Sequence, residues 1–286
     1  MSVQITTAFV EQYKANVLHL AQQKGSKLRD AVRTETVTGK AHFFERIGST
    51  AAQKRTSRHS DTPRMDTPHS RRKVSMDDYD WADLIDNEDK VRMLISPTSE
   101  YAMAGAWAMG RAMDDAIIAA ATGTAYSGVA GGTSVTLPAG QKVAHASGGL
   151  TVTKLISAKE VLDAADIDPD EPRFLVCAAG QIADLLAITQ VTSSDYNTVK
   201  ALASGQIDTF LGFKFIRSQR LGTDSTPSRQ CLAFTKSAIG LAVGADISTK
   251  ISERADKNYA TQVFLSMTIG ATRIEEEKMV EIAANE

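Results

Sequence analysis

The stretch that decides the fold is SPTSEYAMAGAWAMGRAMDDAIIAAATG, residues 96–123. Ser96 is a suitable N-cap, Pro97 suits the first helical position, and Gly123 is a typical C-terminal stop. A helix of this length spans roughly 38 Å, about twice an average helix of a globular protein. Because eleven of the twenty residues from Ala102 to Ala121 are Ala or Gly, other backbone segments can approach it closely. The sequence predicts a long, largely covered helix, and a core helix of an ordinary globular domain remains the alternative.

A polar, basic segment, KRTSRHSDTPRMDTPHSRRK (54–73), precedes this helix. It contains seven Lys and Arg residues and almost no apolar side chain, so it cannot form a core of its own. The flanking segments AHFFERIG (41–48) and VSMDDYDW (74–81) have compositions that favour strands. We therefore expect residues 30–90 to form a two-stranded arm with an exposed tip. Two strands alone are marginal in water, so the arm needs another surface.

Residues 155–245 have an α/β pattern. Ser157 and Glu160 form a capping box for a helix that ends near Ala165. RFLVCA reads as a buried strand, AAGQIADLLAITQ and SSDYNTVKALASG as helices, TFLGFKFIRS and QCLAFT as strands, and KSAIGLAVG as a short helix. This block is expected to form a sheet covered by helices. Outside it, residues 4–24 predict an N-terminal helix, and residues 124–153 predict hairpins or loops.

The composition is that of a folded protein with an uneven charge distribution. The chain has 286 residues, 43% of them hydrophobic, so global disorder is excluded. The net charge is −2, but residues 1–75 hold 14 Lys and Arg against six Asp and Glu. This excess indicates either a nucleic-acid partner or complementary contact between copies of the chain. Cys177 and Cys231 lie in apolar surroundings and are expected to be reduced core thiols.

The motifs that would indicate an enzyme are missing from the sequence. GAWAMGRA (105–112) has two suitably spaced glycines but lacks the Lys-Ser/Thr pair of a P-loop. The five His residues show no metal-binding spacing, and no Glu completes a calcium loop after Asp77, Asp78 and Asp80. No secretory signal or membrane-spanning segment is recognisable, so folding in a reducing cytoplasm is expected. We assign no catalytic, cofactor-binding or metal-binding residue.

The order of these elements resembles that of the major capsid proteins of tailed bacteriophages. The resemblance covers nearly the whole chain and is carried by architecture and by two segments, residues 96–123 and DPDEPRFLVCAAGQ (168–181). It implies an α+β phage-capsid fold. The implied parts are an N-terminal arm (1–37), a two-stranded extended loop (38–86), a peripheral domain (87–154) with a spine helix (97–123), an α/β axial domain (155–245) and return strands of the peripheral domain (246–286).

The resemblance also implies a function. Such a protein self-assembles into hexamers and pentamers that form an icosahedral head around double-stranded DNA, and its extended loop lies over a neighbouring subunit. It implies a virion component assembled in the host cytoplasm, with a portal as a partner, non-specific contact with packaged DNA, and no cofactor or membrane. Because the sequence begins almost directly at the arm, we expect a separate scaffolding protein or an extension already removed.

Under this resemblance the charged side chains become candidates for contacts between subunits. The basic candidates are Lys54, Arg55, Arg58, Arg64, Arg71, Arg72 and Lys73. Their expected counterparts on a neighbouring copy are Asp77, Asp78, Asp80, Asp83 and Asp86. Each exposed pair contributes only about 0.2–1 kcal/mol, so charge guides register while apolar burial supplies most of the association energy.

Two functions from other classes remain open on the sequence alone. The first is a nucleic-acid-binding protein that uses the basic N-terminal third, which would show DNA affinity with a steep salt dependence. The basic segment has no aromatic residue for base stacking except His, so recognition of bases is not supported. The second is an enzyme whose site is assembled between subunits. Sizing the purified protein separates large shells from a small DNA-binding species.

Overall fold

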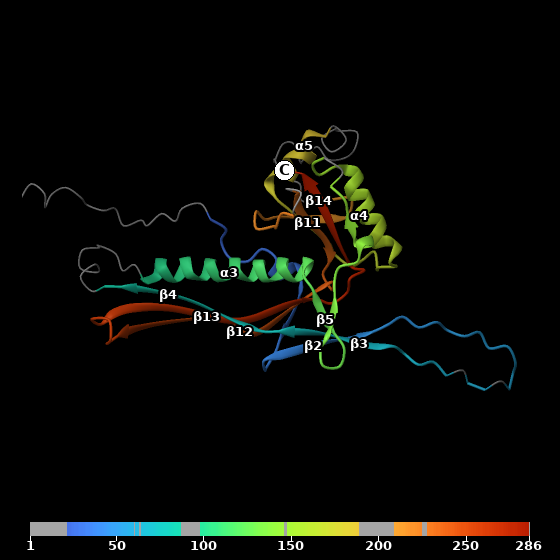
Figure 1. The fold of residues 1–286 in the computed structure, drawn as a ribbon, viewed down its shortest axis with the longest axis horizontal. Helices are drawn as coiled ribbons and strands as arrows, with labels where there is room; N and C mark the ends of the chain where they lie inside the picture. Colours follow the sequence, from blue (N-terminus) through green and yellow to red (C-terminus); the bar gives the residue numbers. More distant parts are fainter. Residues whose placement is uncertain are drawn as a thin grey trace, which may run out of the picture. The chain divides into compact units, whose positions relative to one another are not determined.

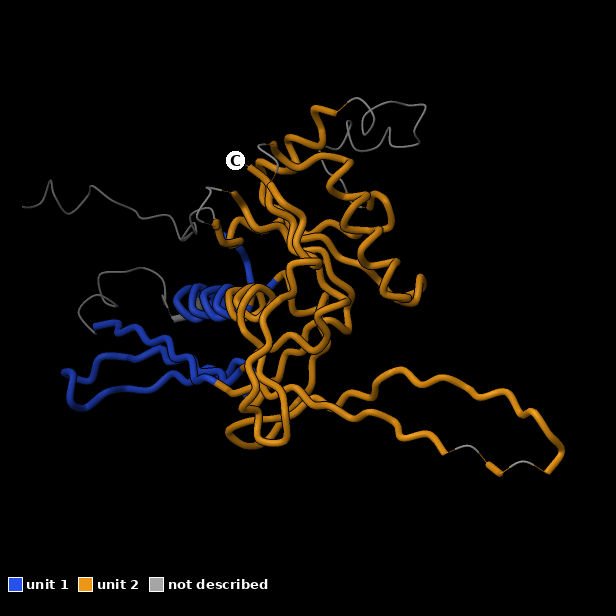
Figure 2. The backbone as a smooth tube through the Cα atoms, turned by 45° about the vertical axis from the view of Figure 1, so that its right-hand side comes forward, with its two compact units in different colours: residues 1–26, 77–113, 245–269 blue, residues 27–76, 114–244, 270–286 orange. Residues whose placement is uncertain are grey.

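The computed structural model describes residues 22–59, 61–62, 64–86, 98–145, 148–188, 209–224 and 228–285. The helix expected at 193–205 lies outside these ranges, as does the helix expected at 4–24 apart from its last three residues, which are not helical. The chain divides into two compact units, coloured separately in Figure 2. Unit 1 comprises residues 1–26, 77–113 and 245–269, and unit 2 comprises residues 27–76, 114–244 and 270–286.

The described elements confirm a mixed α+β class (Figure 1). The helices are α3 (Thr98–Thr122), α4 (Val152–Ala164) and α5 (Ala179–Ala187), with 3-10 turns at Arg29–Ala31 and Ala139–Gln141. The strands are β1 (Arg33–Thr36), β2 (Ala41–Ile47), β3 (His69–Ser75), β4 (Asp77–Ile85), β5 (Ala125–Ser127), β6 (Thr133–Val135), β7 (Lys142–Val143), β8 (Arg173–Cys177), β9 (Thr209–Phe210), β10 (Phe213–Arg217), β11 (Ser228–Thr235), β12 (Ile239–Arg254), β13 (Ala260–Arg273) and β14 (Met279–Asn285).

Unit 1 is built on the first part of α3 and on β4, β13 and the second part of β12. β4 pairs antiparallel with β13, from Asp77 opposite Ile269 to Ile85 opposite Thr261. The buried side chains of β13 alternate along the strand, as expected for a sheet with one covered face. A Cβ on Gly105 of α3 would lie 2.7 Å from both the Leu265 side chain and the Trp81 ring. The small residues of α3 therefore allow close approach, as the sequence predicts.

The larger sheet of unit 2 has six strands in the order β7-β14-β11-β8-β10-β9. β8 and β10 are parallel, whereas β11 is antiparallel to both β8 and β14. Helix α4 packs against β14. Its N-cap is Thr151, whose side chain accepts a hydrogen bond from the Lys154 amide at 3.3 Å. The helix therefore begins six residues before the expected Ser157 capping box.

A second sheet of unit 2 has the order β2-β3-β5-β6. β2 and β3 form an antiparallel hairpin in which Ala41 lies opposite Ser75 and Ile47 opposite His69. One face of this hairpin contributes Phe44 and Val74 to a buried cluster that also contains Val37, Ala242 and Ile274. The base of the expected arm is thus anchored in the core of its own subunit.

Three segments differ from the sequence-based expectation. The strand at 77–85 is not part of the arm, because it pairs with β13. KSAIGLAVG is the start of β12 rather than a short helix, and Gly240 is needed there because a Cβ would lie 2.6 Å from the Phe44 ring. The C-terminal strand β14 joins the six-stranded sheet instead of returning with β12 and β13.

Candidate functional site

The candidate site is the loop that joins β2 to β3, residues 48–68. The amide of Gly48 donates to the carbonyl of Pro68 at 2.9 Å, so the loop leaves and re-enters the body of unit 2 at one point. Figure 2 shows the described residues running outward from this point as two adjacent segments. We call residues 48–68 the extended loop, which is shorter than the expected range 38–86.

Every described residue of the extended loop is exposed. The contacts within it are few: Arg55 donates from Nε to the carbonyl of Ser57 at 2.9 Å, Arg64 lies 4.0 Å from Asp66, and Gln53 donates from Nε2 to Sδ of Met65 at 3.7 Å across the loop. Even Met65, a large apolar residue of the loop, is 43% exposed. The described part of the loop therefore gains little from its own subunit beyond the closure at its base.

The predicted basic residues fall into two groups. Lys54, Arg55, Arg58 and Arg64 lie on the extended loop and are exposed. Arg71, Arg72 and Lys73 lie on β3, where they are half-buried, buried and half-buried respectively. Arg71 pairs with Glu45 at 3.2 Å and lies over the Phe43 ring at 5.4 Å, so part of its interaction is made within the subunit.

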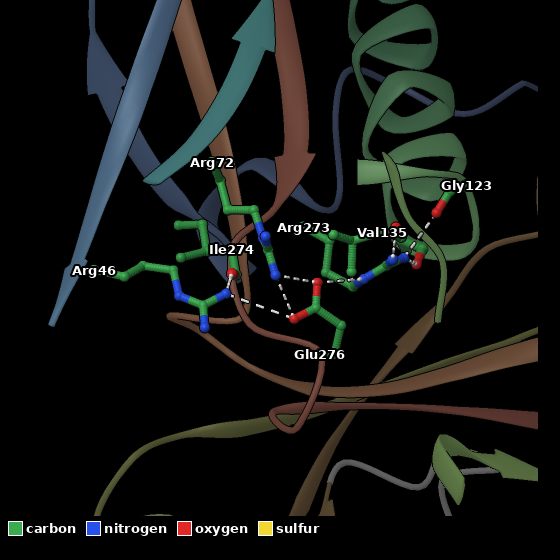
Figure 3. A network of polar contacts seen from close by, with 8 residues as sticks. Arg46, Arg72, Gly123, Val135, Arg273, Ile274 and Glu276 are labelled. Carbon is green, nitrogen blue, oxygen red and sulfur yellow. Dashed lines mark hydrogen bonds and ion pairs between the residues drawn. The ribbon is translucent and has the colours of Figure 1, made fainter. Parts of the chain in front are cut away.

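Arg72 belongs to a network inside unit 2 that sequence reasoning did not identify (Figure 3). Its Nη2 atom donates to both carboxylate oxygens of Glu276, at 2.8 and 2.7 Å. Arg46 lies 3.5 Å from the same carboxylate and donates to the carbonyl of Ile274 at 2.6 Å. Arg273 lies 3.6 Å from it on another side. Because Arg72 is engaged within the subunit, it is a poor candidate for contact with a neighbour.

Arg273 connects this network to the end of α3. Its guanidinium donates to the carbonyls of Ala121, Gly123 and Val135, each within 2.9 Å. The side chain is fully buried, and burial lowers its pKa. The one sequence signal for this role was a cation in the otherwise apolar, alternating pattern of β13; its partners could not be read from the sequence. The network therefore links β2, β3, the end of α3 and the segment after β13 at the base of the extended loop.

The predicted acidic residues lie on or just after β4, in unit 1. Asp77, Asp78, Asp80 and Asp86 are exposed, and Asp83 is half-buried. Asp78 accepts a hydrogen bond from the Thr268 hydroxyl at 2.6 Å, which leaves its second carboxylate oxygen available. β4 is an edge strand, and charged side chains on such an edge disfavour unregulated strand pairing.

The described residues do not assemble a recognisable catalytic or metal centre. They contain no group of three or more His, Cys, Asp and Glu side chains placed to hold a metal ion. Burial raises the pKa of the Cys177 thiol to about 12 and also raises the pKa of Cys231, so neither is a reactive thiolate at neutral pH. None of the described helices has the length and apolar character that crossing a membrane requires.

Comparison with known proteins gives a consistent result. A family model described as Phage capsid protein matches residues 5–286. The structure is similar to the capsid of the cyanophage P-SCSP1u, with a TM-score of 0.75 and 19% identity over 99% of this chain and 95% of that chain. It is also similar to a structure from Mycobacterium phage Che8, with a TM-score of 0.70 and 15% identity over 96% and 97% of the two chains.

A third solved structure, the mature capsid of bacteriophage PhiM1, has a TM-score of 0.64 and 12% identity, over 96% of this chain and 91% of that chain. At these identities the structural likenesses establish the fold. The comparison with curated proteins finds no match.

Proposed function

Because the chain belongs to the phage capsid protein family, and is therefore a structural protein of the virion shell, we propose that its copies assemble into hexamers and pentamers of an icosahedral head around double-stranded DNA. Head-to-tail contact between identical chains closes into rings of this kind. The architecture expected from the resemblance is confirmed at the level of the fold.

The extended loop is the observation that carries the proposal. It is exposed along its described length, yet its base is fixed by the hydrogen bond from Gly48 to Pro68 and by the buried network at Glu276. A polar loop of about 20 residues on a rigid base gains nothing for the fold of its own subunit. Such a loop is explained if it lies on a neighbouring copy of the chain, because its contacts there stabilise the association of the two subunits.

The charges of the loop would guide that contact. Lys54, Arg55, Arg58 and Arg64 are exposed and offer four cations on one segment. The exposed carboxylates of β4 are the proposed counterparts on the neighbour. Exposed pairs of this kind are weak individually and act mainly on encounter and register.

The remaining partners belong to the same proposal. We expect a scaffolding protein and a portal during assembly in the host cytoplasm, and non-specific contact with packaged DNA. The role is structural, without catalysis. A separate function as a nucleic-acid-binding protein has no observation in its favour, since the exposed cations of the extended loop lie on a segment whose described part has no Phe, Tyr or Trp.

Replacing residues 49–67 by an Asn-Gly turn tests the proposal. Because the loop ends are joined by a hydrogen bond, this replacement leaves the hairpin closed. We expect a folded subunit that forms no closed shells by electron microscopy, whereas the unaltered chain forms shells. A second variant keeps the loop length and replaces Lys54, Arg55, Arg58 and Arg64 by Gln.

The two variants separate the contributions of contact and charge. The Gln variant is expected to assemble slowly but to form shells. Normal shells from the shortened chain would reject the role of the loop. Absence of particles from the unaltered chain, across salt and concentration, would reject assembly itself.

A further inference from the structure

The carboxylate of Glu276 is outnumbered by the cations around it. The guanidinium groups of Arg46, Arg72 and Arg273 all lie within 3.6 Å of this one anion. Arg72 and Arg273 are more than nine-tenths buried, and the Nε atom of each is buried without a hydrogen-bond partner. Buried charge without a counter-charge is costly, and so is a buried donor without an acceptor. The cluster is therefore short of both negative charge and acceptor atoms.

The carboxylates that flank the cluster in the sequence do not supply what is missing. Glu45 pairs with Arg71 at 3.2 Å, and Glu275 pairs with Lys278 at 3.0 Å. Glu277 is exposed. Among the described residues, Glu276 is the one carboxylate that pairs with these three arginines.

The register of the β2–β3 hairpin indicates where a second anion can bind. Side chains of directly opposed residues lie on the same face of an antiparallel pair. On one face Arg71 lies opposite Glu45 and pairs with it. On the other face Arg46 lies opposite Ser70, which is exposed and uncharged. The position opposite Arg46 is thus open to an anion from solution.

Arg46 reaches this position with unused donors. Its Nη1 atom donates to the carbonyl of Ile274 at 2.6 Å and lies 3.5 Å from Glu276. Its Nε and Nη2 atoms make no hydrogen bond to a described residue, and Figure 3 draws no contact from them. These two nitrogens form the edge of a guanidinium that binds oxyanions through two parallel hydrogen bonds. The side chain is 26% exposed, so a solute can reach it.

We propose that Arg46 and Ser70 form a binding site for an oxyanion such as inorganic phosphate or sulfate. The Nε and Nη2 atoms of Arg46 and the Ser70 hydroxyl donate to the anion, and Arg72 adds positive charge behind them. Arg46 lies two residues before Gly48, and Ser70 lies two residues after Pro68. An anion bound by both strands therefore joins them directly at the base of the extended loop.

Melting of dissociated subunits in sodium phosphate, sulfate or chloride at equal ionic strength tests this site. For the unaltered chain, phosphate at about ten times its dissociation constant is expected to raise the melting temperature by about 3 °C over chloride. Arg46→Gln should lose this shift, whereas Arg71→Gln, on the opposite face of the hairpin, should keep it. The matched pair is needed because phosphate and sulfate also stabilise folded proteins without binding them.

A second pair of variants supplies the anion from the chain itself. Ser70→Glu places a carboxylate opposite Arg46, as Glu45 lies opposite Arg71. We expect it to raise the melting temperature in chloride by about 1 °C and to abolish the shift in phosphate. Ser70→Gln, which has the same size without the charge, should not raise the melting temperature in chloride.

A short DNA duplex at the same phosphate concentration tests the other source of phosphate oxygens. A shift in phosphate or sulfate that Arg46→Gln and Ser70→Glu abolish and Arg71→Gln keeps supports the site. No shift for the unaltered chain, equal shifts for all variants, or a shift with the duplex alone overturns it. Should Arg46→Gln fail to fold, the comparison of Ser70→Glu with Ser70→Gln decides. Because all these measurements use dissociated subunits, neither result bears on the proposed function.

Discussion

The Nη2 atom of Arg72 lies 2.8 and 2.7 Å from the two carboxylate oxygens of Glu276, a residue 204 positions later in the chain. This ion pair joins β3, which leads out of the extended loop, to the segment between β13 and β14. Three guanidinium groups surround this carboxylate, those of Arg46, Arg72 and Arg273. Glu276 is therefore the anion on which the base of the loop depends.

Replacing Glu276 by Gln is expected to destabilise the subunit by about 3 kcal/mol, because it leaves several largely buried cations close together without a counter-charge. The free energy of unfolding of dissociated subunits in urea measures the effect. Asp66→Asn is the matched control, since Asp66 is 97% exposed beside Arg64. The control should have no measurable effect. A similarly small effect of Glu276→Gln would show that the three arginines do not depend on this counter-charge.

Replacing Gly110 by Ala is expected to lower stability even though Ala is the better helix former. A Cβ there would lie 2.5 Å from the backbone of Gly25 and Ser26, which cannot rotate away as a side chain could. Overpacking of this kind costs about 1–3 kcal/mol, more than the roughly 1 kcal/mol that helix propensity returns. Gly132→Ala, where a Cβ meets nothing within 4 Å, is the control in the same denaturation experiment. Equal stability of the two variants would contradict the close packing of residues 25–26 on α3.

The two thiols should resist modification in the folded subunit. Burial raises the pKa of Cys177 to about 12 and also raises the pKa of Cys231, so the thiolate fraction at pH 8 is very small. A chromogenic disulfide reagent at pH 8 should titrate no thiol in the native protein and both after denaturation. Rapid reaction of one thiol in the native state would show that the six-stranded sheet opens locally.

Assembly should slow as salt rises. The four exposed cations of the extended loop act over roughly the Debye length, which falls from about 30 Å at 0.01 M to about 10 Å at 0.1 M ionic strength. Light scattering during shell formation measures the rate. The variant with Gln at positions 54, 55, 58 and 64 should assemble at a rate nearly independent of salt. A salt-independent rate for the unaltered chain would show that the charges of the extended loop do not affect assembly.

The features that the sequence predicted well are those with local causes. The boundaries of α3, Thr98–Thr122, follow from residues at its ends and from its composition, and the helix was predicted almost to the residue. The strand RFLVC was equally clear, and all five of its residues are buried. The exposed tip of the arm followed from the near-absence of apolar side chains between 54 and 73, where Met65 is the exception.

Features that depend on distant residues could not be predicted in the same way. The strand at 77–85 was assigned to the arm because nothing near it in sequence reveals its partner, β13. The run IGLAV (239–243) is short and apolar, and such a run does not distinguish a strand from a helix. Arg72 appeared to be one of seven similar cations, and only Glu276, far along the chain, distinguishes it.

The guanidinium of Arg273 donates hydrogen bonds to the carbonyls of Ala121 and Gly123, at the C-terminal end of α3. The end of a helix normally frays, but here the last turn of α3 is held by a hydrogen bond from a side chain about 150 residues away in the sequence. Winding or unwinding of α3 is therefore resisted at this end.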